Sequence, residues 1–399
     1  IDLVYCASAA RHLGLPHPTS ETAQNPAIPP QLQYSFYQFL VEGTSFSSIG
    51  GFRCLDTLSP HHGYGEYRHA MERTANACAL KRRPAFIYSL SQWIIDPLYK
   101  KYKTGWDGLS FLYRMHAAGY DMDLFTDRTK NIRWKEYPVV VDSFSMAMES
   151  RLVPELLDYL KNGGKLVIFS STGFHTPGET DTRSELLKQL GCSVAEKMAP
   201  FRKIKFIGKS SGTPDMKLFH YRKITKFPKN ARILAVTEKD SPAIMEFNSG
   251  KGQVLLLAGY PDLEKPLNKT DHIVYNCGRG VSKVKSVYPS VFDRVFYDFC
   301  GVSPVLKSQT DNVMCAIRKD GKSYFIIAFN SSPLCKKARI ELPAIEPWKN
   351  YNGYDLVRRK KVNAAALVME NSEITLNMQP YEVATIQLSP ETIIPPVYD

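Results

Sequence analysis

The chain has 399 residues, of which 44% are hydrophobic and 23% are charged, a composition typical of globular proteins. This length predicts two or three domains, and because no stretch reaches the ~18 uninterrupted apolar residues of a transmembrane helix, we expect no membrane span. The net charge of +12 comes from basic clusters spread over the whole length, so we interpret them as solvated faces and expect no nucleic-acid partner. The alternative is that they bind an acidic polysaccharide or another anionic partner.

Two features of the chain bear on its processing. It opens with Ile1 and shows no signal peptide, so we expect a processed product or a fragment of a longer protein. Its eight cysteines lie far apart without a CxxC pair, which argues against a zinc site, while their even number leaves disulfides open. Asn268 and Asn330 begin glycosylation patterns, although two such matches are common by chance in a chain of this length.

Residues 1–83 alternate predicted helices and strands. Residues 7–13 form a helical segment that Gly14 ends, and the following run to residue 22 is a predicted strand carrying Glu21 near its end. Residues 30–43 predict a second helix, residues 44–46 begin a second strand, and residues 67–80 have helical spacing. This rhythm is that of a (β/α) barrel, which needs ~250 residues, so the block supplies only the last two or three βα units.

Three parts of this block resemble one family of enzymes. Ser20-Glu21-Thr22, the Pro-rich residues 25–30 and the apolar helix ending at Val41-Glu42-Gly43 resemble the last third of the catalytic barrel in family 42 glycoside hydrolases, which are retaining β-galactosidases. The resemblance implies that Glu21 is the catalytic nucleophile at the end of the seventh barrel strand. The family's acid/base Glu lies on the fourth strand, which this chain does not contain. The other interpretation of Glu21 is an idle or helix-capping carboxylate.

The long loop that follows the second strand is rich in Gly, His and aromatic residues, as are loops on the active face of a barrel. We therefore predict that its side chains bind sugar hydroxyls and rings; the alternative is an ordinary polar loop. The predicted substrate-binding residues are Phe52, His61, His62, Tyr64 and Glu66.

Three further residues invite a functional interpretation. Glu42 lies at a helix end and is expected to be an ordinary surface carboxylate. Trp93 and Trp106 would stack on a sugar ring or, as is more usual for tryptophan, lie partly in the core.

Residues 84–303 alternate short apolar strands with helices, which predicts a parallel sheet covered on both faces. The strands are expected at 85–90, 121–125, 137–142 and 165–169, and the helices at 109–118, 152–160 and 183–190. Residues 203–260 are expected to continue as β-structure. This block resembles the flavodoxin-like domain that mediates trimer formation in the same family. Its turn at residues 169–173 has no Cys for amidotransferase chemistry, and Gly163-Gly164 forms no GxGxxG loop, so we expect no nucleotide or other cofactor.

Residues 304–399 carry five short strands with turn signals between them, at 313–318, 323–330, 338–342, 373–376 and 383–388. Such spacing predicts an antiparallel β-sandwich or a small barrel. The segment from Leu376 onward resembles the C-terminal β domain of the same family. The predicted fold class is therefore α/β: the end of a (β/α)8 barrel, then a flavodoxin-like domain, then a small antiparallel β-sandwich.

Two functions from different classes fit these observations. The first is a retaining glycoside hydrolase of β-galactosidase type that acts on a carbohydrate without a metal or cofactor, with the rest of the barrel supplied by upstream sequence or a partner chain. The second is a non-catalytic structural or carbohydrate-recognition relative. The resemblance also implies a homo-oligomer, a trimer in that family. It favours secretion, since enzymes of polysaccharide breakdown often act outside the cytosol.

Overall fold

The structure is a computed structural model, and the statements below concern the part of the chain that it describes. The described residues are 2–13, 19–22, 37, 40–42, 45–49, 64–80, 83–95, 115, 120–175, 184–208, 216–261, 274–276, 280–282, 298–302, 304–310, 313–332, 334–364 and 372–393. They form a mixed α/β structure in which strands outnumber helices.

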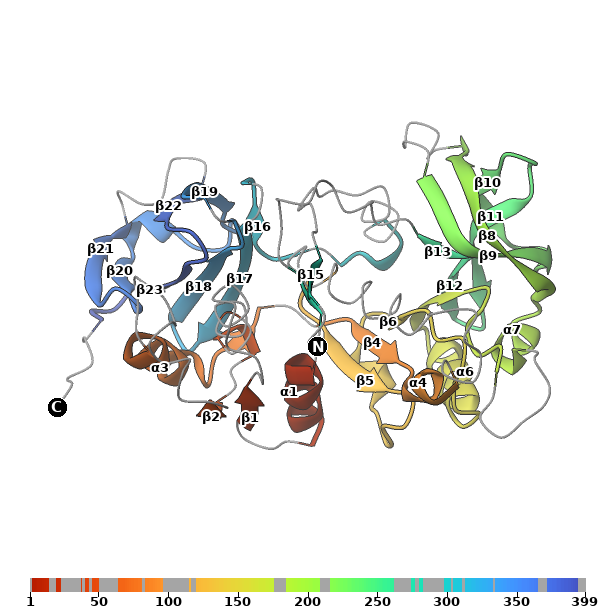
Figure 1. Ribbon diagram of the computed structural model, residues 1–399, viewed down its shortest axis with the longest axis horizontal. Helices are drawn as coiled ribbons and strands as arrows, with labels where there is room; N and C mark the ends of the chain where they lie inside the picture. Colours follow the sequence, from red (N-terminus) through yellow and green to blue (C-terminus); the bar gives the residue numbers. More distant parts are fainter. Residues whose placement is uncertain are drawn as a thin grey trace.

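A ten-stranded sheet dominates one half of the molecule (Figure 1). Its parallel strands, in sheet order, are β12 (Gly252–Leu257), β7 (Lys165–Phe169), β6 (Val140–Asp142), β4 (Ala85–Tyr88) and β5 (Asp123–Thr126). These strands are short apolar runs, and β4 is buried along its whole length. Burial on both faces is what a parallel sheet between helices requires.

The helices of this half are α4 (Leu90–Ile95), α6 (Leu152–Lys161) and α7 (Glu185–Gln189). α6 buries one apolar stripe that includes Leu152, Leu156 and Leu160. It ends because Gly163 adopts a φ of +96°, a conformation that glycine enters at little cost. The four strands and two of the three helices expected in this block therefore lie within a few residues of their predicted positions; of residues 109–118 only Met115, which is helical, is described.

The strands expected between residues 85 and 169 pair in parallel, and the β-structure expected over 203–260 continues the same sheet, mostly with antiparallel strands. These strands extend the sheet beyond β12 in the order β11 (Pro242–Ser249), β10 (Arg232–Thr237), β8 (Ser193–Phe206), β9 (Met216–Lys226) and β13 (Tyr260–Pro261). The physical reason lies in the turns. Asp240 and Gly250 take positive φ angles of 55° and 60° between adjacent strands, and such turns reverse the chain within a few residues.

The C-terminal strands form two antiparallel sheets that face each other across a shared apolar core. The six-stranded sheet has the order β21 (Lys360–Asn363), β20 (Asn352–Asp355), β23 (Val383–Ser389), β18 (Ser323–Asn330), β17 (Val313–Asp320) and β3 (Cys78–Ala79). The smaller sheet has the order β16 (Lys307–Ser308), β19 (Lys336–Glu341) and β22 (Glu373–Met378). All five strands expected after residue 310 are present, and the described residues there contain no helix of ten or more residues.

The N-terminal segment contains α1 (Asp2–Leu13), β1 (Thr19–Thr22), β2 (Ser45–Ile49) and α3 (Tyr64–Thr74). β1 pairs with β2 in parallel, and helical residues at 40–42 lie on the connection between them. A parallel pair needs a crossover of this kind, so the predicted alternation of strand, helix and strand is present in the backbone. The helix expected over 67–80 ends earlier, because β3 leaves the helix and pairs with β17.

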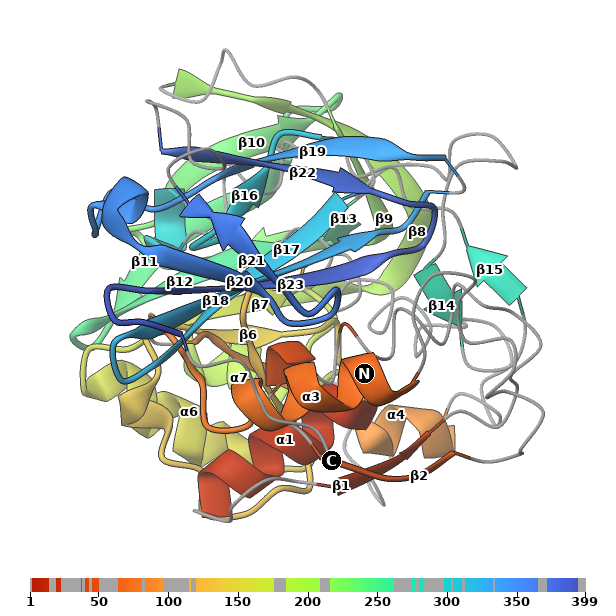
Figure 2. The same cartoon turned by 90° about the vertical axis from the view of Figure 1, so that its left-hand side faces the viewer.

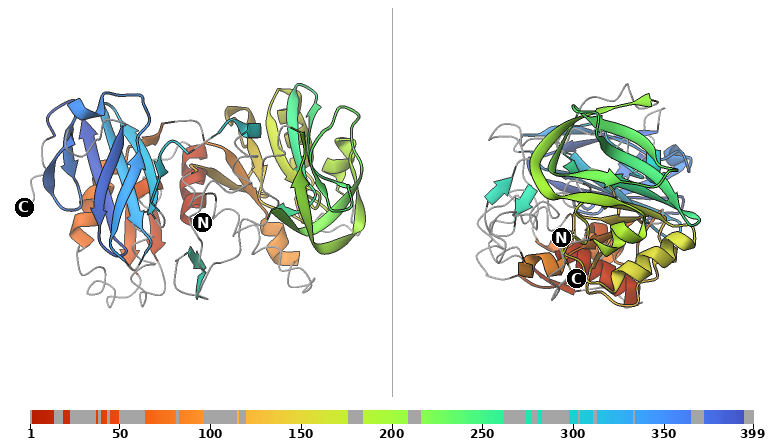
Figure 3. Two further views of the ribbon diagram at one scale, coloured as in Figure 1. Left: turned by 90° about the horizontal axis from the view of Figure 1, so that it is seen from above. Right: turned by 90° about the vertical axis from the view of Figure 1, so that its right-hand side faces the viewer.

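The N-terminal segment lies between the two large sheets. α1 packs beside β5, while α3 and the residues before β2 pack on the six-stranded sheet, where Tyr37, Leu40 and Tyr67 join Phe325 and Ile327 in one buried cluster. Figure 2 shows α3 beneath that sheet, and Figure 3 shows α1 between the two halves of the molecule. A small antiparallel pair, β14 (Val274–Asn276) and β15 (Gly280–Ser282), lies outside these sheets.

Candidate functional site

The predicted nucleophile lies on β1, opposite Ser48 of β2. Glu21 is the next-to-last residue of its strand, which is where barrel enzymes carry their catalytic groups. The structure describes the backbone at Glu21 and not its side chain. Of the predicted substrate-binding residues, Tyr64 and Glu66 lie in the first turn of α3 with undescribed side chains, and Phe52, His61 and His62 lie outside the described residues. Their proposed contacts with a sugar remain predictions.

Trp93 lies in α4 with its side chain undescribed, and Trp106 is outside the described part of the chain. The stacking and core interpretations of these two residues therefore stay open as predictions.

Glu42 is buried, so the expectation of an ordinary surface carboxylate is wrong. Only 1% of its side chain is exposed, and its Oε2 accepts hydrogen bonds of 2.9 Å from both Arg11 and Arg83. A buried carboxylate is stable in its charged form only when such donors replace its hydration. The helix end that carries Glu42 is packed between α1 and the chain before β4, and this packing removes it from solvent.

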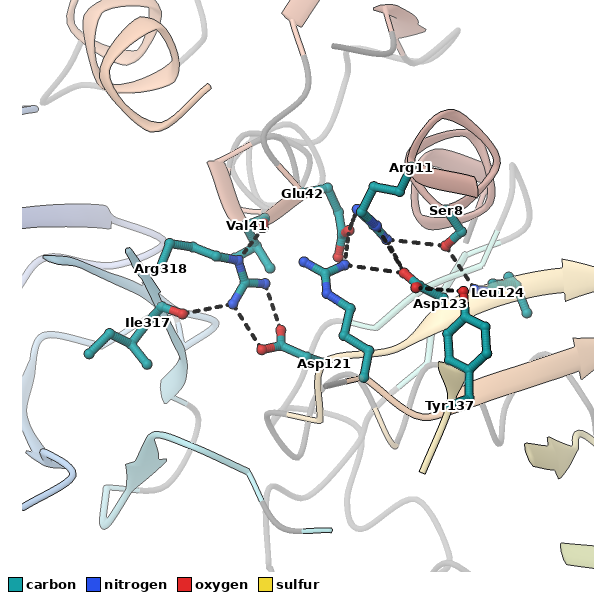
Figure 4. A network of polar contacts seen from close by, with 11 residues as sticks. Ser8, Arg11, Val41, Glu42, Asp121, Asp123, Leu124, Tyr137, Ile317 and Arg318 are labelled. Carbon is teal, nitrogen blue, oxygen red and sulfur yellow. Dashed lines mark hydrogen bonds and ion pairs between the residues drawn. The ribbon is translucent and has the colours of Figure 1, made fainter. Parts of the chain in front are cut away.

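Asp123 at the start of β5 is the second acidic centre of the same cluster. Arg11 Nε donates to its Oδ1 at 2.9 Å, and Tyr137 Oη donates to its Oδ2 at 3.1 Å. Ser8 supports this arrangement, since its hydroxyl accepts from Arg11 Nη2 at 3.2 Å and from the backbone N of Leu124 at 2.8 Å (Figure 4). α1 is thereby held against the edge strand of the ten-stranded sheet.

Arg318 joins the opposite side of the cluster to the six-stranded sheet. Its side chain is 0% exposed, and it donates two hydrogen bonds to the carboxylate of Asp121, at 3.0 and 2.6 Å. Its Nε donates to the backbone O of Val41 at 2.6 Å, directly before Glu42 (Figure 4). One guanidinium therefore contacts β17, the N-terminal helical residues and the segment before β5.

The electrostatics of this charged junction keep Arg83 ionised. Burial alone would lower the pKa of Arg83, but the charges of Glu42, Asp123 and Asp121 outweigh it and raise that pKa above its usual value. Burial and the neighbouring charge of Asp123 raise the pKa of the Tyr137 hydroxyl. Since a guanidinium transfers no proton at neutral pH, the junction suits positioning rather than acid–base catalysis.

A pocket of about 450 Å³ opens beside this junction. Its walls carry four basic side chains and three others, namely Arg11, His12, Arg83, Arg133, Asp123, Glu136 and Tyr137. The three arginines already pair with a carboxylate, Arg133 with Glu136 at 3.1 Å and the other two as described. We therefore regard the pocket as the open side of the junction and assign it no catalytic role.

A second polar cluster lies at the carboxyl ends of the parallel strands, where open α/β sheets commonly bind ligands. Asp142 at the end of β6 accepts from the backbone N of Ser145 at 3.0 Å and from Thr172 Oγ1 at 2.6 Å. Ser171 Oγ accepts from Arg222 Nε at 3.1 Å. The turn after β7 thus directs two of its hydroxyls to neighbouring side chains in the fold, which matches the absence of a Cys nucleophile there. Burial raises the pKa of Asp142 to about 6, against the opposing hydrogen bonds.

Metal, disulfide and membrane features can be stated for the described residues only. Within them no group of three or more His, Cys, Asp and Glu side chains is arranged to hold a metal ion, and no helix has the length and hydropathy to cross a bilayer. Five cysteines have described side chains, and all five are free thiols: Cys78, Cys192, Cys300, Cys315 and Cys335.

The sequence offered a weak signal for the charged junction. Arg11 and Glu42 flank the predicted barrel strand, and Asp121 and Asp123 lie at the start of another predicted strand, but their partners lie up to 197 residues away. Charged residues at the ends of buried segments are the local sign of such a junction. Their pairing becomes visible only in the folded chain.

Comparison with solved structures identifies the fold. No family model and no curated protein matches the chain. Gan42B, a GH42 β-galactosidase from G. stearothermophilus, is 14% identical, with a TM-score of 0.61 over 97% of this chain and 56% of its own. The β-galactosidase of Bacillus circulans sp. alkalophilus is 13% identical, with a TM-score of 0.61 over 97% of this chain and 57% of its own. The β-galactosidase of the haloarchaeon Halorubrum lacusprofundi is 16% identical, with a TM-score of 0.60 over 96% of this chain and 55% of its own.

The chain therefore has, over nearly its whole length, the fold of part of a GH42 β-galactosidase. The predicted resemblance is confirmed at this level. The chain spans little more than half the length of these proteins, and identity of 13–16% shows the fold alone.

The buried Arg318–Asp121 pair leads to a first prediction. Arg318→Met should lower the free energy of unfolding by about 3–5 kcal/mol, because it leaves a largely buried carboxylate without its partner. Urea denaturation followed by circular dichroism measures the change. Lys322→Met, in the turn that follows β17, is the matched control: its pair with Glu391 is exposed on both sides, so its loss of stability should be much smaller than that of Arg318→Met. Equal losses in the two variants would contradict the role assigned to Arg318.

The raised pKa of Asp142 predicts a pH-dependent stability. The folded protein holds the Asp142 proton up to about pH 6, whereas the unfolded chain releases it near 3.8, so the stability contributed by Asp142 falls as the pH rises between these values. Above both pKa values, the free energy of unfolding lost through this shift is roughly 3 kcal/mol. Asp142→Asn cannot ionise, so its stability relative to wild type should rise by most of that amount from pH 4 to pH 7.

Urea denaturation of both proteins at the two pH values tests this. Thr172→Val should strengthen the pH dependence of the otherwise wild-type chain, since it removes a hydrogen bond that favours the ionised carboxylate. A stability difference between wild type and Asp142→Asn that is the same at pH 4 and pH 7 would rule out a raised Asp142 pKa.

Proposed function

We propose that this chain is part of a retaining glycoside hydrolase of β-galactosidase type, which cleaves terminal β-linked sugars with Glu21 as nucleophile and an acid/base Glu from outside this chain. The observation that carries the proposal is the parallel pair of β1 and β2 within a GH42-like fold, with Glu21 next to the end of its strand. The carboxyl ends of neighbouring parallel strands meet at one edge, where barrel enzymes assemble their active sites.

The chemistry follows from two carboxyl groups ~5 Å apart. The Glu21 carboxylate attacks the anomeric carbon while the bond from that carbon to the leaving oxygen breaks, and the second carboxyl gives its proton to that oxygen. A glycosyl ester on Glu21 results. Water then attacks the same carbon, gives a proton back to the second carboxylate, and releases the sugar and the free Glu21 carboxylate. No metal or cofactor enters this sequence.

The loop between β2 and α3 supplies the proposed sugar contacts. Phe52 and Tyr64 would line the cleft with aromatic rings, and His61, His62 and Glu66 would donate to or accept from sugar hydroxyls. Support comes from the place of this loop in the chain, directly after a strand parallel to the one carrying Glu21. Loops in that position form the active face in barrel enzymes.

We further propose three units: residues 1–83 as the C-terminal portion of the (β/α)8 barrel, 84–303 as a flavodoxin-like domain and 304–399 as a β-sandwich. The parallel strands β12, β7, β6, β4 and β5 support the second unit, and the two facing antiparallel sheets support the third. β3 departs from a strict division, since it belongs to the first unit and pairs with β17 of the third.

The alternative function is a non-catalytic carbohydrate-recognition or structural relative. The net charge of +12 favours it, because hydrolysis of a neutral galactoside has no use for such a charge. Sequence identity of 13–16% to the β-galactosidases is also low enough for catalytic groups to have changed while the fold persisted.

The flavodoxin-like unit predicts self-association by analogy with the trimer-forming domain it resembles. Light scattering on the purified protein should give three times the protomer mass, which is 45.1 kDa for this chain. A molar mass that stays at one protomer at tens of micromolar would remove the proposed trimer, without bearing on Glu21.

The nucleophile is tested by Glu21→Gln in the longest natural form of the protein that contains this chain. The amide keeps the shape of the carboxylate but cannot form the glycosyl ester, so hydrolysis of an aryl β-galactoside should fall by at least ~10³-fold. Glu72→Gln, on the exposed face of α3, is the matched control and should retain wild-type turnover. A 2-deoxy-2-fluoro-β-galactoside should label Glu21 covalently, as read by mass spectrometry of the peptide.

Two results would overturn the catalytic proposal. Unchanged turnover in Glu21→Gln would remove Glu21 from the mechanism. A wild-type protein with no turnover and no label on any aryl glycoside would favour the recognition alternative.

A further inference from the structure

The positive charge of the chain is concentrated on one hairpin of the ten-stranded sheet. Strands β8 and β9 together carry eight Lys and Arg residues against one Glu, a net +7 out of the +12 of the whole chain. The sequence places these residues in separate basic clusters on either side of a connection. The antiparallel pairing of β8 with β9 brings the clusters together.

One face of this hairpin is a basic–aromatic patch, which consists of Phe201, Lys203, Lys205, Lys217 and Phe219. The register places Phe201 opposite Phe219 and Lys203 opposite Lys217, and directly opposed residues share a face. The two Phe rings are 6.4 Å apart, and the Lys217 ammonium lies 5.6 Å from the centre of the Phe201 ring. The other face of the hairpin is the core side, where the intervening residues Ile204 and Leu218 are buried.

The ring contacts within the patch favour this arrangement, but two of its features carry a cost. Like charges directly opposite each other on a sheet destabilise it, and Phe201 keeps 46% of its surface in water. Lys205 has an ion pair with Asp240 at 3.3 Å, but both groups are exposed and such pairs contribute little. A ligand that brings negative charge and an apolar surface would turn both costs into binding energy.

We propose that the basic–aromatic patch binds an anionic polysaccharide, a galactan carrying sulfate or carboxylate groups. Lysine ammonium groups attract the repeated charges, and an aromatic side chain packs against the C–H face of a sugar ring. We favour polysaccharide over nucleic acid because the proposed function of the chain acts on sugars. This inference therefore rests on that proposed function. The two rings are also tilted by 59° to one another, which suits successive contacts along a sugar chain better than a flat base stack.

The patch is separate from the strand that carries Glu21. Figure 1 shows β8 and β9 at one end of the molecule, with α1 and the parallel strands between them and β1. The patch therefore holds the polymer, while the proposed reaction takes place elsewhere. This separation also explains why the alternative, non-catalytic function would retain the patch.

Binding is tested by affinity electrophoresis and calorimetry with carrageenan, a sulfated galactan, and with the same polymer after chemical desulfation. The wild-type protein should bind the sulfated form, more weakly as salt rises, and bind the desulfated form at least ~10-fold more weakly. The double variant Lys203→Gln/Lys217→Gln should lose roughly tenfold in affinity for the sulfated form. Phe201→Ala should weaken binding with an unchanged salt dependence, since it removes no charge.

Lys161→Gln/Lys251→Gln is the matched control. It removes two exposed charges near the turn between β11 and β12, away from the patch, and should bind as wild type does. The inference is overturned if the control variant loses as much affinity as the patch variant. Equal binding of sulfated and desulfated galactan, or displacement of carrageenan by poly(dT) at the same charge concentration, would overturn it as well.

These outcomes are distinct from those of the proposed hydrolysis. Galactoside turnover with no carrageenan binding would remove the patch and leave Glu21 in place. Carrageenan binding by a protein without turnover would keep the patch and remove the catalytic proposal.

Discussion

The buried pairing of Arg318 with Asp121, together with Glu42 between Arg11 and Arg83, is the constraint on which the arrangement of the chain depends. Each of these charges would lose several kcal/mol of hydration on burial without a partner. The partners come from three distant parts of the sequence, so the full set of pairs forms only when the N-terminal segment, the edge of the ten-stranded sheet and β17 are all in place. The cluster thus couples the positions of the two large sheets.

Apolar packing alone would fix this arrangement less sharply. The cluster of Tyr37, Leu40 and Tyr67 against the six-stranded sheet supplies burial, and burial tolerates small rotations and slides. A bidentate guanidinium–carboxylate pair does not, because its two hydrogen bonds need a common plane. The hydrophobic contacts therefore hold the N-terminal segment between the sheets, and the ion pairs set its register. β1 and β2 belong to that segment, so its position fixes theirs. Arg318, although distant, therefore helps to position the strand that carries Glu21.

The two functional surfaces proposed for the molecule lie on different structural elements. The strand of Glu21 belongs to the N-terminal segment beside the charged junction, whereas the basic–aromatic patch belongs to antiparallel strands at the far end of the ten-stranded sheet. A reaction at the strand end needs neutral contacts with one sugar, and a polymer-binding face needs repeated charge. Their separation on the molecule lets each have the composition that its task requires. It also places the exposed lysines where their mutual repulsion is screened by solvent.

The sequence by itself determined the local structure. Short apolar runs such as residues 165–169, the glycines that end α6 and the alternating strands after residue 310 specify their elements through periodicity and turn chemistry, and the elements lie close to where these patterns predict. Glu21 was placed near the end of a strand in the same way. Only the tertiary structure decided that Glu42 is buried, that the helix before β3 stops to let that strand pair with β17, and that two separate basic clusters share one hairpin. The reason is the distance along the sequence. A pattern of a few residues predicts the local helix or strand, whereas Arg318 donates to the backbone O of Val41, 277 residues away, and that contact exists only after folding.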